Sequence, residues 1–209
     1  MTLPTAYMAP KEWYKAYLIA PEEVEIEGLE SFEKQTCRNR AIIRDRCQVD
    51  LRVQTAIQVD LRVQTAARLT SEYRPIMLTV PVKKVEHKQL TRDIEISYQS
   101  HWQHQHWISL VSTYKNTPYF DYYEEFFKPF YEKEYRFLWD LNSEIHETIM
   151  ALMRNERPSA VSRVRPVSAF SYRCTADWRG EELNRFFGDG KSILDELFEY
   201  GPETTDHLR

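Results

Sequence analysis

Glycine is scarce in this sequence, with five residues among 209. A loop that cradles phosphate needs several closely spaced glycines, and neither GxGxxG nor a Walker A loop is present. The GxSxG turn that carries the serine of many hydrolases is missing as well. These absences disfavour the common nucleotide-binding loops and that nucleophile motif, and the sequence names no cofactor.

Long hydrophobic runs are also missing. A segment that spans a bilayer needs about 18 consecutive apolar residues, and the sequence contains no such run. The N-terminal residues also lack the charged start and apolar segment of a signal peptide. We therefore expect a cytoplasmic protein without a transmembrane segment. The formal net charge of -4 gives no general attraction to nucleic acid, although basic residues gather between Lys34 and Arg46. Binding to nucleic acid is therefore disfavoured.

Cysteine is rare too. Cys37, Cys47 and Cys174 are an odd number without CxxC spacing, which favours reduced thiols over a zinc site. Basic neighbours could lower the thiol pKa of Cys37 and Cys47 and permit acyl transfer, but an ordinary buried cysteine is the favoured interpretation.

The chain length fits one domain over residues 1–209, because no low-complexity linker divides it. One nonapeptide, QVDLRVQTA, occurs twice, at 48–56 and at 58–66. The offset is even, so the valines and leucines of both copies would share one face of an extended chain. We expect an inserted or duplicated element at about 48–67 that extends a hairpin. A functional arm, or a helix through part of it, is the alternative.

Short apolar groups at Val24, Ile26 and Ile42-Ile43 predict that the first third of the chain is rich in β-strands. Residues 77–82 form a credible strand, and the alternation at 93–98 predicts a second strand antiparallel to it.

From Trp102 onward the pattern becomes helical, with helices expected over 102–116, 120–134 and 143–154 and a break at Thr117-Pro118. The predicted fold class is α+β, with antiparallel strands in the N-terminal half and helices in the C-terminal half.

Histidines and aromatic residues are concentrated between His101 and Tyr135. This segment and several strings outside it resemble the WbqC-like protein family, in the form found in Bacteroidetes. The strings that carry the resemblance are TAYMAP (5–10), EGLESFEKQTCRNR (27–40), LTVPVKK (78–84), HW (106–107), YKNTPYF (114–120), FYEKEY (130–135), LWDLN (138–142) and SILDELFEYGPE (192–203).

The resemblance implies a role in bacterial surface-polysaccharide biosynthesis of the O-antigen type, because such proteins are often encoded in those gene clusters. It implies a pathway rather than a reaction. Two departures from the family pattern stand out. The repeat replaces a short loop that often contains Asn-Gly, and the segment between Asp177-Trp178-Arg179 and Ser192 is short.

The strongest candidate for binding an anion is the string from Lys34 to Arg40. Arg38 and Arg40 would share one face of a strand, where paired guanidinium groups suit a phosphate or a carboxylate. A solvated strand face is the alternative. The predicted substrate-binding residues of this string are Lys34, Gln35, Arg38, Asn39 and Arg40.

His101, His104 and His106 form an HxxHxH pattern. On a helix the third histidine points away from the first two, so we predict no metal site. His106 belongs to the family-like HW pair, and its imidazole is the candidate general base or acid. A buried, hydrogen-bonded histidine is the more common role for such a residue.

Aromatic residues around Lys115 form the second candidate binding region. Trp107, Tyr114 and Tyr119 could stack against a sugar while Lys115 contacts a negative group. The alternative is a helix end packed with core aromatics. Asp140 and Asn142 are interpreted as residues that start the following helix.

Two functions from different classes fit these residues. The first is a transferase that acts on an activated sugar or glycan precursor, with phosphate on the basic string and His106 near the reacting group. The second is a non-catalytic binding or scaffold protein that recognises a glycan or a charged partner. The first predicts that Arg38, Arg40, His106 and Lys115 line one concavity. The sequence does not predict the oligomeric state.

Overall fold

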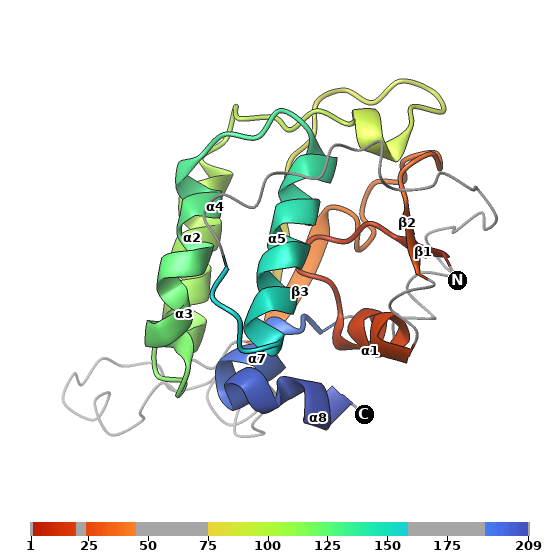
Figure 1. The fold of residues 1–209 in the computed structure, drawn as a ribbon. Helices are drawn as coiled ribbons and strands as arrows, with labels where there is room; N and C mark the ends of the chain where they lie inside the picture. Colours follow the sequence, from red (N-terminus) through yellow and green to blue (C-terminus); the bar gives the residue numbers. More distant parts are fainter. Residues whose placement is uncertain (1, 20–23, 45–74, 159–190, 209) are drawn as a thin grey trace, which may run out of the picture.

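The computed structural model describes residues 2–19, 24–44, 75–158 and 191–208, and its architecture is α+β, as predicted. The helices of the middle of the chain stand side by side in one half of the molecule, and the short strands and the first helix occupy the other half (Figure 1). The repeat at 48–67, Cys47, Cys174 and the element at 177–179 lie outside the described residues.

Short strands form two separate pairs in the described part of the chain. β1 (Thr2–Pro4) runs parallel to β2 (Glu25–Glu27). β3 (Arg40–Arg44) runs antiparallel to β4 (Pro75–Thr79) and pairs with it along its whole length. The inward side chains of this second pair include Ala41, Ile43 and Leu78, whereas Met77 on the other face is 54% exposed.

The predicted strand at Ile42-Ile43 is β3, and the predicted strand at 77–82 is β4, which begins two residues earlier and ends at Thr79. The predicted pairing of 77–82 with 93–98 is reduced to one antiparallel bridge between Val82 and Ile96, because β4 takes β3 as its partner.

Helices supply most of the core. Their bounds are α1 (Lys11–Ile19), α2 (Trp102–Tyr114), α3 (Phe120–Phe127), α4 (Pro129–Glu132), α5 (Leu138–Met153), α7 (Leu194–Tyr200) and α8 (Thr204–Leu208), with 3₁₀ turns at Thr91–Asp93 and Gly201–Glu203. No helix in the described ranges has both the length and the apolar composition needed to cross a bilayer.

The predicted break between the first two helices is confirmed. Thr117 closes α2, since both its backbone N–H and its hydroxyl donate to the carbonyl of Tyr114, at 2.8 and 2.6 Å. The predicted helix over 120–134 is divided into α3 and α4 at Pro129, which starts a new helix as its first residue. The third predicted helix begins five residues early, at Leu138, after the extended Phe137.

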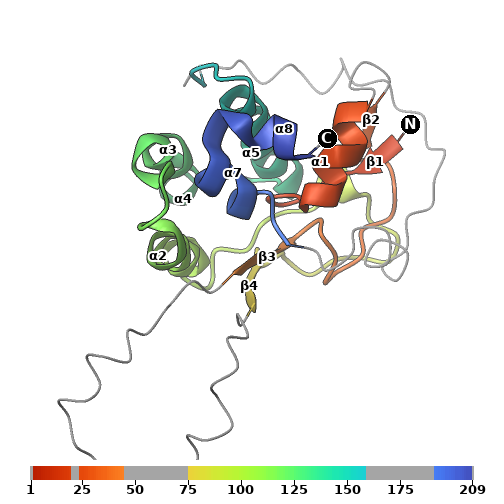
Figure 2. The same ribbon diagram turned by 90° about the horizontal axis from the view of Figure 1, so that it is seen from below.

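The helix α5 passes through the middle of the fold, and its inner face is buried along its whole length. Beside it, Phe198 of α7 contacts Tyr114 of α2 and Phe120 and Phe127 of α3, with ring centroids 4.8 to 5.4 Å apart. Seen from below, α7 lies between α3 and α1 (Figure 2). The C-terminal family-like string therefore contributes side chains to the core.

Candidate functional site

The basic string ahead of β3 is divided between the core and the surface. Arg38 is 0% exposed, and its Nε donates to Oε1 of Glu30 at 2.6 Å. Burial raises the pKa of the Glu30 carboxyl, although the hydrogen bond and the charge of Arg38 oppose that rise. Arg38 lies in the turn before β3, so the strand face that it was predicted to share with Arg40 does not form.

The other residues of that string have different surroundings. The Asn39 side chain is buried and donates to the carbonyl of Val80 at 3.2 Å. Lys34 and Gln35 are exposed, and Gln35 has a positive φ of 68° in the turn. Arg40 is half-buried, and its Nε is buried without a hydrogen-bond partner among the described residues.

His106 is 6% exposed and takes part in a buried group of polar contacts. Its Nδ1 lies 3.0 Å from the Tyr7 hydroxyl, which is hydrogen-bond distance. The Tyr7 hydroxyl lies 3.0 Å from that of Tyr131. Burial outweighs a backbone hydrogen bond with Thr79, which raises the pKa, and lowers the pKa of His106 to about 4, so the ring is neutral near pH 7.

The aromatic residues around Lys115 also differ in exposure. Tyr114 is buried and donates to the Asp195 carboxylate at 2.7 Å, which ties α2 to α7. Trp107 is half-buried, and its ring centroid lies 5.7 Å from that of Tyr131. Tyr119 is also half-buried, and Lys115 is exposed at the end of α2.

Among the described residues, Arg38, Arg40, His106 and Lys115 do not line one concavity as predicted. A fully buried Arg38 cannot line a cavity that a ligand enters, and His106 is buried as well, whereas Lys115 is exposed. His101 and His104 are exposed, whereas His106 is buried, so the three histidines do not share one environment. Cys37 is half-buried, and burial of its thiol raises the pKa to about 12, which fits a structural rather than a reactive cysteine.

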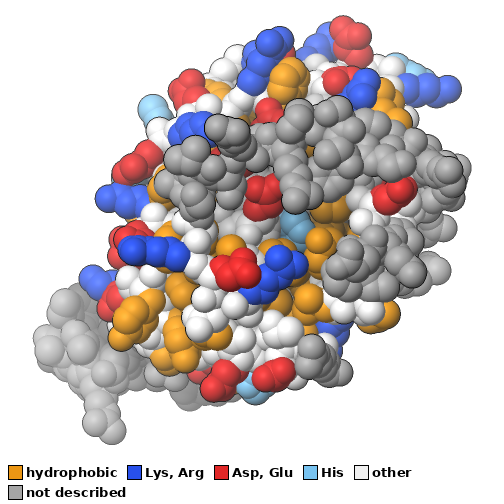
Figure 3. Space-filling view, in the orientation of Figure 1, with side chains coloured by type: hydrophobic (Ala, Val, Ile, Leu, Met, Phe, Trp, Pro, Cys, Tyr) orange, Lys and Arg blue, Asp and Glu red, His pale blue; other side chains and the backbone are white. Residues whose placement is uncertain are grey.

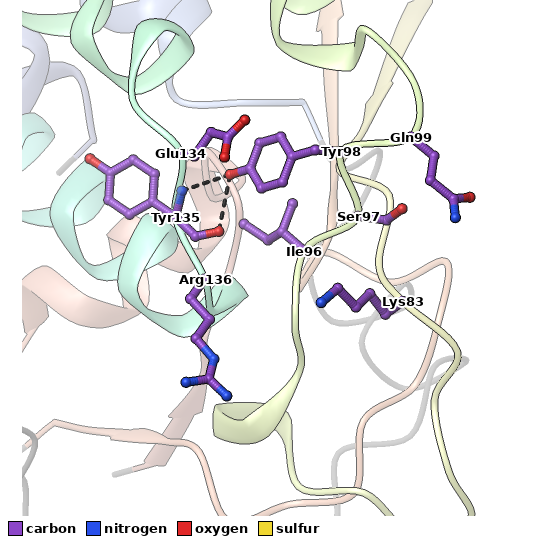
Figure 4. Close-up of a pocket in the computed structure, with 8 residues that line it drawn as sticks. All are labelled: Lys83, Ile96, Ser97, Tyr98, Gln99, Glu134, Tyr135 and Arg136. Atoms are coloured by element: carbon purple, nitrogen blue, oxygen red, sulfur yellow. Dashed lines mark hydrogen bonds between the residues drawn. The ribbon is translucent and has the colours of Figure 1, made fainter.

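A pocket of about 560 Å³ lies elsewhere, where the segment before α2 meets the segment between α4 and α5 (Figure 4). We call it the tyrosine pocket. Its lining residues are Lys83, Ile96, Ser97, Tyr98, Gln99, Glu134, Tyr135 and Arg136.

Tyr98 fixes the shape of this pocket. Its hydroxyl accepts from the backbone N–H of Tyr135 at 2.7 Å and donates to the carbonyl of the same residue at 3.0 Å. The Tyr135 ring points away from Tyr98 (Figure 4), and its hydroxyl donates to Glu144 of α5. Burial raises the pKa of Tyr98, and the nearby Glu134 charge raises it further. The two walls of the pocket are therefore held together by paired bonds.

Charged side chains border the pocket on neighbouring backbone segments. Glu95 accepts from Lys83 Nζ at 2.7 Å through Oε2 and from Arg136 through Oε1, at 3.0 Å from Nη2. These bonds, with that of Lys83 first, hold the pKa of Glu95 below its usual range. Positive and negative side chains are interspersed along the upper edge of the molecule (Figure 3), where the segments 83–99 and 134–136 run in Figure 1.

This arrangement is suited to binding a polar molecule. The pocket offers the hydroxyl of Ser97, the amide of Gln99 and the carboxylate of Glu134, which are groups that hydrogen-bond to sugar hydroxyls, and the Tyr98 ring adds an apolar surface. No group of three His, Cys, Asp or Glu side chains that could hold a metal ion occurs in the described part of the chain.

None of these lining residues was predicted as a site residue. Lys83, Glu134 and Tyr135 lie inside the family-like strings LTVPVKK and FYEKEY, and the alternation at 93–98 correctly places Glu95 opposite the buried Ile94 and Ile96. Those signals could have indicated part of the pocket. No local sequence pattern predicts that the segment near Arg136 lies beside these residues.

Together these features define an α+β protein with a tyrosine-walled surface pocket that is lined by both apolar and polar atoms. The model of the WbqC-like protein family matches residues 30–169, which is more than half of the chain, and the protein belongs to that family. The whole lining of the tyrosine pocket lies within the matched residues. The family is associated with polysaccharide biosynthesis genes. No curated protein and no solved structure matches the chain.

Proposed function

We propose that this protein is a transferase in bacterial surface-polysaccharide biosynthesis, of the O-antigen type, and that it holds an activated sugar or glycan precursor in the tyrosine pocket. The observation that carries the proposal is the lining of the pocket, where hydrogen-bonding side chains, a carboxylate and two cations surround about 560 Å³. A cavity of this size accommodates a sugar with a substituent.

Glu134 is the residue to which we assign general-base catalysis in place of His106. Its carboxylate lines the pocket and is directed toward the ring of Tyr98 (Figure 4). In the proposed step, the oxygen of an acceptor hydroxyl bonds to the transferred group as the bond from that group to its phosphate breaks. Glu134 takes the hydroxyl proton, and Lys83 and Arg136 balance the charge of the departing phosphate.

A second candidate function, binding without catalysis, is favoured by the state of His106. Its ring is buried and burial lowers its pKa to about 4, so the histidine of the family-like HW pair is a weak base near pH 7. In that case the pocket would recognise a glycan for another protein.

Ser97→Trp tests the pocket, since the bulky indole would obstruct part of it. We expect this variant to lose binding of nucleotide sugars and neutral oligosaccharides in calorimetry. Ser112→Trp is the matched control, because Ser112 is exposed on α2 away from the pocket. Equal binding by Ser97→Trp and the wild-type protein would refute the proposed site.

Glu134→Gln separates the two candidate functions. If the protein is a transferase, the variant should still bind the precursor but transfer it at least about 100-fold more slowly, which is the usual range for loss of a general base. Radiolabelled sugar transfer to extracted glycan lipids measures this. Binding by the wild-type protein without any transfer would favour the recognition function.

A further inference from the structure

A second hollow adjoins the tyrosine pocket. It has a volume of about 350 Å³, and Lys83 lines both hollows. Glu95 lines the second hollow, whereas Arg136 lines the first. The ion-paired group of Lys83, Glu95 and Arg136 therefore stands at the boundary between the two hollows. We call this group the boundary triad.

The backbone fixes the positions of the boundary triad. The N–H of Lys83 donates to the carbonyl of Glu95 at 2.9 Å, and the N–H of Ile96 donates to the carbonyl of Arg136 at 3.0 Å. Antiparallel bridges join Val82 to Ile96 and Glu95 to Phe137. Three neighbouring segments thus hold two cations on either side of one carboxylate.

The side chains of the boundary triad are partly or largely exposed. The side chains of Lys83 and Arg136 are 62% and 75% exposed, and that of Glu95 is 27% exposed. Ion pairs as exposed as these contribute little to stability, so replacing the Glu95 carboxylate by another oxyanion costs little. An arginine can bind a phosphate or a carboxylate through two parallel hydrogen bonds, which favours such an exchange.

We infer that an oxyanion of the ligand binds between Lys83 and Arg136, in the place that the Glu95 carboxylate occupies, with the groups on its two sides in the two hollows. The inference rests on the proposed binding of a precursor in the tyrosine pocket and specifies its class. The ligand is a bipartite molecule whose anionic centre links two polar groups. Glu95 competes with that centre and weakens binding until it is displaced.

Two sources can supply this anionic centre. The first is the phosphate or pyrophosphate of an activated sugar, and the second is the carboxylate of an acidic sugar within a glycan. Calorimetry of the full-length protein with uridine diphosphate glucose, an oligoglucuronate and a neutral oligosaccharide of equal length distinguishes them.

Glu95→Gln is the decisive variant, because it removes the competing charge and keeps the shape. We expect it to bind uridine diphosphate glucose, the oligoglucuronate, or both, roughly fivefold more tightly than the wild-type protein, which is within the range for the loss of exposed ion pairs. Binding of the neutral oligosaccharide should not change. The probe that responds identifies the source of the oxyanion.

Lys83→Gln should have the opposite effect and lower the affinity for the responding probe roughly fivefold, which is within the same range of ion-pair strengths. Glu125→Gln is the matched control. Glu125 is exposed on α3 and also accepts a hydrogen bond from an arginine, Arg157. It should leave all affinities unchanged. Glu95→Asp, whose shorter side chain cannot reach both cations, provides a second gain-of-affinity variant if Glu95→Gln fails to fold.

Two results separate failure of this inference from failure of the proposed function. If the wild-type protein binds the neutral oligosaccharide in the tyrosine pocket but Glu95→Gln leaves both anionic probes unchanged or binds them more weakly, the oxyanion position is wrong and the proposed pocket stands. If the wild-type protein binds none of the probes, both are wrong.

Discussion

The neutral ring of His106 makes the stability of this protein depend on pH at the scale of one residue. Its pKa is about 4 in the folded protein and 6.5 as an ordinary histidine, so the unfolded chain binds more protons between these values. The associated stability is complete above pH 6.5 and decreases as the pH falls toward 4. The difference corresponds to about 3 kcal/mol at most.

We predict that His106→Gln flattens this dependence. Urea unfolding at pH 4.5 and at pH 7.5 should show a large difference in free energy for the wild-type protein and a smaller one for the variant. His146, whose pKa burial also lowers to about 4, remains in both proteins and cancels in the comparison. An identical pH difference in the two proteins would contradict the buried, neutral state of His106.

Arg38 shows why the sequence did not predict the burial of one candidate site residue. A cation among other cations looks like an exposed binding residue, and nothing in KQTCRNR indicates burial. The deciding partner is Glu30, which lies eight residues earlier and accepts from Arg38 in the core. Pairing between residues of a turn and a preceding loop depends on how the chain folds back, and composition does not specify it.

At the scale of elements, the hydroxyl of Tyr98 joins the segment before α2 to the residues that lead into α5. Tyr98→Phe keeps the ring and removes both hydrogen bonds to the Tyr135 backbone. We predict a loss of about 1–3 kcal/mol of unfolding free energy, because the N–H and the carbonyl of Tyr135 lose their partner.

Amide hydrogen exchange gives the local measurement for this variant. The Tyr135 amide should exchange faster in Tyr98→Phe, while the Leu110 amide, inside α2, should keep its protection. Unchanged exchange at Tyr135 would show that the hydroxyl does not hold the two segments together.

The helices were predicted better than the strands for a physical reason. Helical periodicity is a local property, so α2 begins at Trp102 as expected and the break at Thr117-Pro118 is found. Strand partners lie far apart in sequence, and β4 pairs with β3 rather than with the segment at 93–98. The helix α1 was missed because its aromatic residues also suit a β-rich interpretation.

At the scale of the whole molecule, the register of β3 and β4 allows a prediction about the repeat. Arg44 lies opposite Pro75, so the two ends of the connection that contains the repeat are adjacent. A short connection can join such ends, and loop length changes the entropy of closure only weakly.

We therefore predict that deletion of residues 58–67, which are Gln58 to Ala67, leaves a folded protein. Its unfolding free energy should change by no more than about 1 kcal/mol, which is the scale of loop-length effects. Differential scanning calorimetry measures this, and a cooperative transition near that of the parent protein is expected. Loss of the cooperative transition would mean that the duplicated residues are part of the core, and that the proposed single domain depends on them.

The pocket walls come from segments that lie far apart in the sequence. Glu95 and Arg136 are separated by 41 positions, and α2, α3 and α4 lie between them. Because these walls meet only when the helices between them are packed, the unfolded chain lacks this binding surface. A ligand of the pocket would therefore stabilise the folded protein selectively, and its concentration would influence how much of the protein survives proteolysis.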